Sequence, residues 1–346
     1  MILRIEHNER AAETYLWDRY VLDHTQGTGY HLTAWRGVIE KVFGHSTIYL
    51  MAVDDKKQVR GVLPLVVLSS KLFGRFMVSV PFFNYGGIVA DSRSFEEELL
   101  DAAAAVAREH QISHIELRQQ SPLNLGLPSK IHKVSMRLQL PQDAEALWKT
   151  FPSKLRSQIR RGEKEGLTAK LGGLDLLDDF YGVFARNMRD LGTPVYGKGF
   201  FREILQTFPK ESKVCVVYHG ETPLAAGFLY GYRQTLEIPW ASSDRRWARF
   251  APNMMLYGTV LKFACENGYR EFDFGRSSAD SKTYQFKAQW GAKPVQLYWY
   301  YWLQEGSDFP EINPQNPKYH FAIEIWKRLP VGLTTLIGPR IAKYLP

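Results

Sequence analysis

An acidic residue, an arginine and a lysine lie close together in the sequence around a glycine. The segment 272–276 (FDFGR) puts the carboxylate of Asp273 between apolar neighbours, where a buried charge needs a partner. Lys287 follows within the aromatic segment 284–291 (YQFKAQWG). A carboxylate can handle a proton, and cationic side chains can stabilise a developing negative charge. We therefore predict that Asp273, Arg276 and Lys287 are catalytic.

A second motif, PFFNYGG at 81–87, places two glycines after an apolar segment and beside aromatic residues. Glycines allow a ligand or another backbone to approach closely. We predict that this motif binds substrate through Asn84, Tyr85, Gly86 and Gly87. A tight turn with packed aromatic rings is the alternative interpretation.

A third motif is the basic segment 154–164 (KLRSQIRRGEK). On a helix, Arg156 and Arg160 lie one turn apart on one face, an arrangement that suits phosphate oxygens. We predict that both arginines hold phosphate groups of a substrate. A solvated charged face of a helix is the alternative.

Polar residues also follow a helix-like segment at 186–196 (RNMRDLGTPVY), where Asn187 and Asp190 are one turn apart and Thr193 follows a glycine. We predict that these three residues position a substrate, whereas ordinary capping of the helix end would explain the glycine and proline alone.

A predicted strand ends at Trp240 and Ser242, and three arginines at 245, 246 and 249 precede a helix that begins near Asn253. Cations and free backbone N–H groups at the start of a helix favour an anion. We therefore predict substrate-binding roles for Trp240, Ser242 and Asn253.

Several common catalytic motifs are missing from the sequence. It has no P-loop, no GxGxxG, no GxSxG and no HExxH, and its nine histidines form no ligand pair. We therefore predict no metal site and no tightly bound cofactor. The two cysteines, Cys215 and Cys265, each lie in an apolar segment, which favours packing and excludes a disulfide framework.

The composition, with 45% hydrophobic and 23% charged residues, is that of a globular protein. A net charge of +8 favours an anionic partner, and we expect RNA, a phosphate-bearing substrate or a membrane surface, but not DNA. No apolar run is long enough for a signal peptide or a membrane-spanning helix, so we expect a cytoplasmic protein.

The elements that must position these residues occur twice. The segments 46–70 and 212–234 each read as strand, turn, strand, and each follows a helix-like segment. A helix and one more strand come after each hairpin, at 95–120 and at 253–277. The final strands contain acidic residues at matching places, Glu116 and Asp273. A repeated order of this kind predicts two copies of one unit.

The mixed order of helices and strands predicts an α+β fold with a mixed sheet in each domain. We expect a first domain over 1–140, a second domain with the transfer site over 141–304, and a tail over 305–346. Asp143 is expected to cap the first helix of the second domain.

The order of elements and the motifs resemble the FemAB family of aminoacyl- and acyltransferases, whose members carry two GNAT-like domains. The sequence looks closest to the subgroup associated with PEP-CTERM/exosortase and exopolysaccharide loci. The resemblance is carried by 84–87, 155–161, 272–275, Phe286-Lys287 and Trp290-Gly291, and for the subgroup by 186–201 and Asn253-Met254.

This resemblance implies two tandem GNAT-like domains and the transfer of an activated acyl or aminoacyl group to an amine of a cell-envelope precursor, in peptidoglycan or exopolysaccharide synthesis. Lys287 matches the lysine of the family's Phe-Lys motif, which implies that it contacts the donor or stabilises the oxyanion. Aminoacyl-tRNA and acyl-CoA both remain open as the donor. A catalytically silent module that binds a glycan or lipid-linked intermediate is the alternative function.

The tail mixes apolar and basic residues in the segment FAIEIWKRLPVGLTTLIGPRIAKYLP (321–346). Such a pattern can lie in a membrane interface or pack on the protein. Peripheral contact with the inner face of the cytoplasmic membrane is therefore one expectation for the chain.

Overall fold

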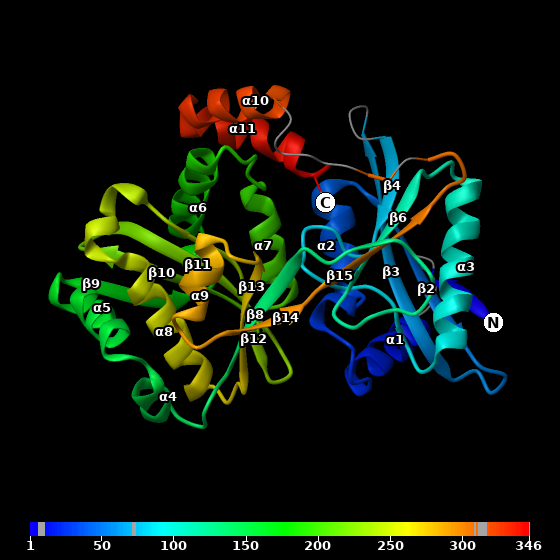
Figure 1. Cartoon of the computed structure of the whole chain (residues 1–346), viewed down its shortest axis with the longest axis horizontal. Coiled ribbons are helices and arrows are strands. Elements are labelled where there is room, and N and C mark those ends of the chain that lie inside the picture. The colour runs from blue at the N-terminus through cyan, green and yellow to red at the C-terminus, as the bar shows by residue number, and fades with distance from the viewer. Residues whose placement is uncertain (6–10, 71–73, 308, 311–316, 346) are drawn as a thin grey trace. The chain divides into compact units, whose positions relative to one another are not determined.

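The computed structural model describes residues 1–5, 11–70, 74–307, 309–310 and 317–345, and the chain divides into two compact units (Figure 1). Unit 1 consists of residues 1–134, 295–312 and 344–346, and unit 2 consists of residues 135–294 and 313–343.

Unit 1 is built on a mixed sheet in the order β1-β2-β3-β4-β6-β15-β7, with β5 paired to β3. The strands are β1 (Ile2–Ile5), β2 (Ser46–Val53), β3 (Val59–Ser70), β4 (Gly74–Val78), β5 (Val89–Ala90), β6 (His114–Gln119), β7 (Ser129–Lys130) and β15 (Tyr298–Leu303). The helices are α1 (Ala11–Asp23), the 3-10 helix η1 (Gly29–His31), α2 (Ala34–Phe43) and α3 (Arg93–Glu109).

Helix α3 covers one face of this sheet, and α1 and α2 lie on the other (Figure 1). Leu99, Ala103 and Ala107 recur every four residues, so they share one face of α3, and all three are fully buried against the sheet. The turn between β2 and β3 is closed by the carboxylate of Asp54, which accepts hydrogen bonds from the backbone N–H groups of Lys56 and Gln58 at 2.9 Å.

Unit 2 is built on a second mixed sheet in the order β14-β8-β13-β12-β11-β10-β9. The strands are β8 (Lys133–Gln139), β9 (Leu167–Gly172), β10 (Ser212–His219), β11 (Thr222–Tyr232), β12 (Thr235–Ser243), β13 (Glu271–Ser278) and β14 (Lys293–Gln296). The helices are α4 (Ala144–Thr150), α5 (Ser153–Lys164), η2 (Leu174–Leu176), α6 (Leu177–Leu191), α7 (Lys198–Thr207), η3 (Arg245–Phe250), α8 (Pro252–Glu266), α9 (Lys282–Ala288), α10 (Pro317–Arg328) and α11 (Val331–Ala342).

The alternation of side chains along β11 shows which helices cover each face of this sheet. Phe228 packs against Phe180 of α6 and Phe201 of α7. Its neighbour Gly227 faces the opposite side, where a Cβ would lie 3.6 Å from Leu256 of α8. Helices α6 and α7 therefore cover one face of the sheet, and α8 covers the other.

The predicted repeat is confirmed by the order of the elements. Hairpin β2-β3, strand β4, helix α3 and strand β6 in unit 1 correspond to hairpin β10-β11, strand β12, helix α8 and strand β13 in unit 2. In both units the last strand pairs in parallel with the strand that follows the hairpin. The predicted cap is present as well, because Asp143 accepts a hydrogen bond from the N–H of Ala146 at 2.7 Å.

Two strands belong to sheets other than those expected from their places in the sequence. Most of the segment 133–139, expected in the first domain, lies in unit 2 as β8. The segment 298–303, expected in the second domain, pairs with β6 of unit 1 as β15. Strand pairing is a contact between distant segments, and the local hydrophobic pattern does not specify the partner. The tail is also divided, since residues 313–343 belong to unit 2.

In the part of the chain that the structure describes, every helix is too short or too polar to cross a bilayer.

Candidate functional site

The central feature of unit 2 is a parallel strand pair that separates. Strands β12 and β13 are paired only at three positions, the last of which joins Glu237 to Asp273, although both strands continue beyond it. The register of β12 against β11 shifts directly after Glu237, and Pro239, which has no N–H to donate, lies in the shifted segment. The bulge therefore bends β12 away from β13.

Two carboxylates are buried where the strands separate. Asp273 is fully buried, and it accepts hydrogen bonds from Oγ of Ser135 at 2.5 Å and from the N–H of Gly275 at 2.7 Å. The Nε atom of Arg137 lies 3.4 Å from Oδ2 of Asp273. Glu237 is also buried and neighbours Asp273 across the strand pair. Two adjacent buried carboxylates require cationic neighbours.

Lys287 provides the second cation from the last turn of α9. Its side chain is only 8% exposed, and Nζ donates hydrogen bonds to the carbonyl oxygens of Gly275 and Arg276, each at 2.9 Å. Burial lowers the pKa of Lys287 to about 8, although the negative charges of Asp273 and Glu237 oppose this shift. An ammonium group has three donors, so these two bonds leave one N–H for another acceptor.

The three predicted catalytic residues therefore lie on neighbouring segments of unit 2 with different exposure. Asp273 is inaccessible to solvent, Lys287 is nearly so, and Arg276 is exposed next to them on β13. The positive charge of Arg276 lowers the pKa of Lys287 further, which reflects how close the two side chains are.

A second polar group lies at the far end of β12. Asn187 of α6 donates a hydrogen bond to Oγ of Ser242 at 3.1 Å, so the structure brings these two predicted residues together. The carboxylate of Asp244, which is buried, forms ion pairs with Arg246 at 2.5 Å and with Arg186 at 3.4 Å. Burial opposes ionisation of Asp244, but the bonds from Arg246 outweigh it and lower the pKa.

Other predicted residues on this side have structural contacts. Trp240 packs edge-on against Phe201, with ring centroids 5.1 Å apart, in the aromatic cluster between β12 and α7. Asp190 pairs with Arg189 at 2.7 Å. The backbone N–H of Thr193 bonds the carbonyl of Met188 at 2.9 Å, as part of the cap that ends α6.

Asn253 lies in the first turn of α8, half-buried, and α8 itself starts at Pro252 after a residue with a left-handed backbone, Ala251. The predicted arginines form the short helix η3 directly before it. Arg246 of η3 is paired with Asp244, and the substrate-binding role of Asn253 stays a prediction.

In unit 1, the motif 81–87 lies beside a small cavity of about 130 Å³. Tyr85, Gly86 and Gly87 line this cavity, and Asn84 is buried next to them. The Nε2 atom of His31 lies 3.0 Å from the carbonyl oxygen of Gly87, and burial lowers the pKa of His31 to about 4. The cavity therefore has a neutral imidazole in its lining, together with Arg118 and polar side chains such as Gln119.

Glu116 occupies in unit 1 the place that Asp273 occupies in unit 2. Each is the last paired residue of the parallel strand pair, and each is buried. Glu116 is held by Arg118 at 2.7 Å and by the hydroxyl of Tyr301, which donates at 3.0 Å. Arg118 belongs to the same strand as Glu116, whereas the lysine near Asp273 comes from a separate helix.

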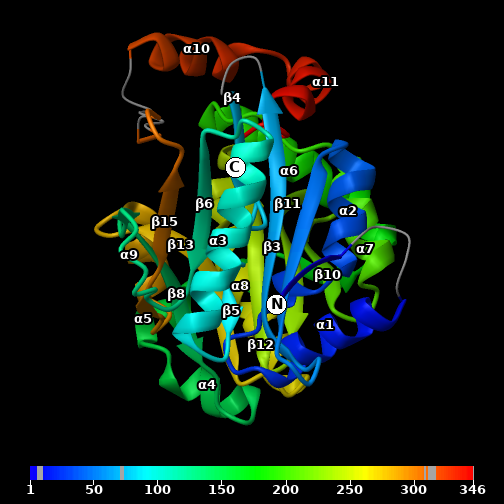
Figure 2. The same ribbon diagram turned by 90° about the vertical axis from the view of Figure 1, so that its right-hand side faces the viewer.

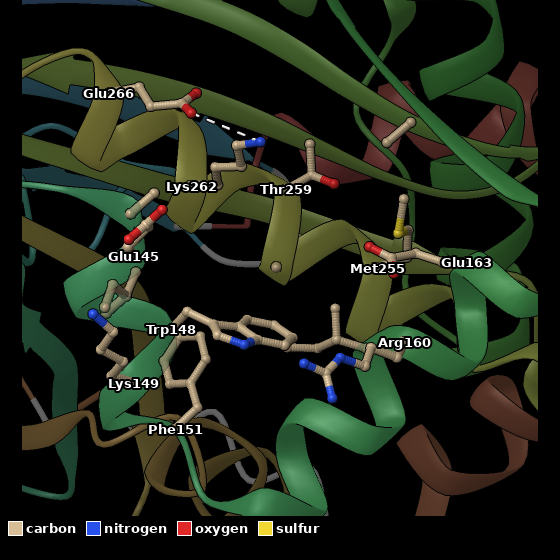
Figure 3. A pocket seen from close by; sticks show the side chains of 15 residues that line it. Glu145, Trp148, Lys149, Phe151, Arg160, Glu163, Met255, Thr259, Lys262 and Glu266 are labelled. Carbon is tan, nitrogen blue, oxygen red and sulfur yellow. Dashed lines mark ion pairs between the residues drawn. The ribbon is translucent and has the colours of Figure 1, made fainter.

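A groove of about 780 Å³ lies between α4, α5 and α8 of unit 2 (Figure 3). Trp148 lies in its centre, with the guanidinium of Arg160 5.2 Å from the indole ring. Arg156 does not line the groove, so only one of the two arginines predicted to bind phosphate lies in it. The charged side chains around it are balanced in sign, namely Lys149, Arg160, Lys262, Glu145, Glu163 and Glu266.

Sequence reasoning missed Glu237, Ser135 and Arg137. Glu237 and Ser135 belong to β12 and β8, which neighbour β13 in the sheet but are distant in sequence, and Arg137 belongs to β8 as well. The available signal for Glu237 was its position between two apolar residues, Leu236 and Ile238. In the described residues, no group of three histidine, cysteine or acidic side chains is placed to hold a metal ion.

Comparison with known proteins identifies this architecture. The model of the acetyltransferase (GNAT) domain family matches residues 151–288, which fall in unit 2. No curated protein sequence matches the chain.

Among solved structures, FemX is similar with a TM-score of 0.67 at 16% sequence identity, covering 86% of this chain and 97% of FemX. The C-terminal domain of a protein named as a lysylphosphatidylglycerol synthetase from Agrobacterium fabrum has a TM-score of 0.55 at 15% identity, covering 84% of this chain and 92% of that one. A tandem GNAT protein from the clavulanic acid biosynthesis pathway has a TM-score of 0.53 at 10% identity, covering 90% and 100%. The predicted fold is thus confirmed: the chain has a FemAB-like fold of two tandem GNAT-like domains, each on a mixed sheet.

Proposed function

We propose that the chain is an N-acyltransferase whose reaction takes place in unit 2, where β12 and β13 separate. The observation that carries this proposal is the position of Lys287, which is nearly buried, directed at the end of the parallel pair and left with one free N–H. The match of residues 151–288 to a GNAT domain supports acyl transfer as the class of reaction.

In this mechanism, the neutral amine of the acceptor attacks the carbonyl carbon of the donor and a tetrahedral oxyanion forms. The intermediate then collapses as the bond to the CoA sulfur or the tRNA ribose oxygen breaks, and the proton lost by the amine passes through solvent to the leaving group. The remaining N–H of Lys287 would stabilise this oxyanion, since a fixed donor in a water-poor site acts more strongly than one in solvent. Asp273 and Glu237 keep the ammonium charged. Because Asp273 is fully buried, we assign it the positioning of Lys287 and Gly275 and not contact with the amine.

Arg276 is the exposed member of the group, so we assign it to the phosphate of the donor. The GNAT match favours acyl-CoA, whereas the FemAB resemblance of the sequence implies an aminoacyl group on tRNA. Both donors carry phosphate groups, and the net charge of +8 suits either.

For the acceptor, we propose an amine of a cell-envelope precursor. The FemAB resemblance supports this class, and a similar solved structure is named as a lysylphosphatidylglycerol synthetase, which also points to an envelope component. The subgroup associated with PEP-CTERM/exosortase and exopolysaccharide loci stays a prediction from the sequence. A cytoplasmic location stays a prediction as well.

To test this proposal, the purified chain is incubated with either acetyl-CoA or a mixture of aminoacyl-tRNAs as the donor. An extract of envelope precursors serves as the acceptor, and mass spectrometry detects the acylated product. We expect one donor to give product. Replacing Lys287 with Met should reduce the rate by about 100-fold or more, as loss of one oxyanion donor does. Lys282→Met, on the exposed side of the same helix, is the matched control and should retain the rate.

The pH profile provides a second readout. The acceptor amine becomes more reactive as it deprotonates in the same range, so the informative quantity is the rate of the parent divided by that of Lys287→Met. If Lys287 acts as a cation, this ratio falls as pH rises above about 8, the pKa of this lysine. A ratio that stays constant through this range would contradict the assigned role. Full turnover of Lys287→Met would refute the proposal, and transfer from neither donor would favour the silent binding module.

A further inference from the structure

Helices α10 and α11 form a separate layer of unit 2 that packs on α6 (Figures 1 and 2). The inner face of α11 consists of small residues, Thr334, Gly338 and Ala342, which are buried at intervals of four. Gly338 sits directly against Val195, where a Cβ would meet the backbone N of Val195 at 2.9 Å. The helix therefore needs its small residues for packing.

Four larger apolar residues of these helices are exposed to solvent. Phe321 and Ile325 of α10 are 70% and 46% exposed, and Leu333 and Leu336 of α11 are 38% and 61% exposed. Their spacing of three or four residues places each pair on one side of its helix. These four residues are called the tail face below. A cluster of exposed large apolar side chains marks a surface that contacts something other than water.

Arginines continue both rows of the tail face. Arg328 follows Ile325 on α10, and Arg340 follows Leu336 on α11, and both are exposed. Residues 321–345 contain four basic side chains and one acidic one. The acidic one, Glu324, is paired with Lys327 at 2.6 Å. The outer side of these helices thus combines exposed apolar groups with positive charge.

We propose that the tail face lies in the headgroup region of an anionic lipid bilayer. The apolar side chains would enter the boundary of the acyl chains, while Arg328 and Arg340 would meet lipid phosphates at the same depth. A second copy of the chain is a poorer partner for this surface. A two-fold contact would place the same surface against itself and bring its arginines together, with little acidic charge to offset them.

The test is co-sedimentation of the full chain with vesicles of equal parts phosphatidylglycerol and phosphatidylcholine, compared with vesicles of phosphatidylcholine alone. We expect binding to the anionic vesicles that weakens with added salt. The double variant Arg328→Gln/Arg340→Gln should bind roughly 30-fold more weakly, since each basic residue near the surface contributes about fivefold. The double variant Phe321→Ser/Leu336→Ser should bind at least about tenfold more weakly than the parent.

Two matched controls accompany these variants. Ile131→Ser replaces an apolar residue that is 60% exposed in unit 1, and Lys293→Gln replaces an exposed lysine on β14. Both should bind as the parent does. All the substituted positions are exposed, so circular dichroism and the melting temperature should stay unchanged.

Absence of binding to anionic vesicles, or equal binding by the parent and both double variants, would overturn the proposal. Size-exclusion chromatography decides the competing case, because a dimer in the parent that Phe321→Ser/Leu336→Ser abolishes would assign the tail face to a second copy.

Discussion

Replacing Lys287 with Met should remove a specific dependence of stability on pH. In the folded chain the pKa of Lys287 is lowered from 10.5 to about 8, mainly by burial. Between these two values the unfolded chain holds a proton on this lysine that the folded chain has lost. The unfolded state then binds more protons, so the stability of the parent protein rises with pH across this window.

The magnitude follows from the shift. Each unit of pKa corresponds to about 1.4 kcal/mol, so the parent should gain about 3 kcal/mol of unfolding free energy from this group between pH 8 and 10.5. Other groups titrate in the same range, but they do so in both proteins. The difference between the parent and Lys287→Met therefore isolates the lysine.

The assay is urea unfolding followed by tryptophan fluorescence, in steps from pH 7 to 10.5. The stability of the parent relative to Lys287→Met should rise across the window, while Lys282→Met, an exposed lysine on the same helix, should run parallel to the parent. Titration of the lysine side chain by NMR measures the same pKa directly. Parallel curves for the parent and Lys287→Met, together with titration near 10.5, would refute the assignment of Lys287 as a buried cation.

Two further predictions concern buried positions. Asp273→Asn should lower the unfolding free energy by about 1–3 kcal/mol, because Ser135 and Gly275 lose a charged acceptor and Arg137 keeps only Glu271 as an ion-pair partner. A loss under about 0.5 kcal/mol in urea unfolding would show that the carboxylate does not have this role. Gly87→Ala should destabilise unit 1 by about 1–3 kcal/mol, since the new Cβ would lie 2.4 Å from Nε2 of Gln119. The control Gly199→Ala has open space around it and should not lower the melting temperature. Equal melting temperatures for the two variants would contradict this prediction.

The local patterns of the sequence predicted most of the secondary structure and the repeat. The hairpins at 46–70 and 212–234 are recognisable because alternating apolar residues flank a polar turn, and Asp54 closes the first turn through its own neighbours. The cap at Asp143 likewise depends on residues within one turn. These features are visible in one dimension because their causes act over a few residues.

The order of the elements and the motifs also led to the confirmed fold. The same reading singled out Asp273 and Lys287, which the structure places in one region of unit 2. A carboxylate within an apolar strand requires a partner wherever the strand is buried, and this requirement can be read from the sequence. The identity of the partners cannot be read in the same way, because a buried charge can be neutralised by any cation that the fold brings near.

The tertiary structure decided which segments meet. It placed β8 next to β13, so Ser135 and Arg137 contact Asp273 from a segment more than a hundred residues away in the sequence. It paired Glu237 with Asp273 and bent β12 away directly afterwards. Strand pairing and side-chain burial are long-range properties of the folded chain, so the surroundings of Lys287, and with them its pKa, depend on contacts that no local pattern encodes.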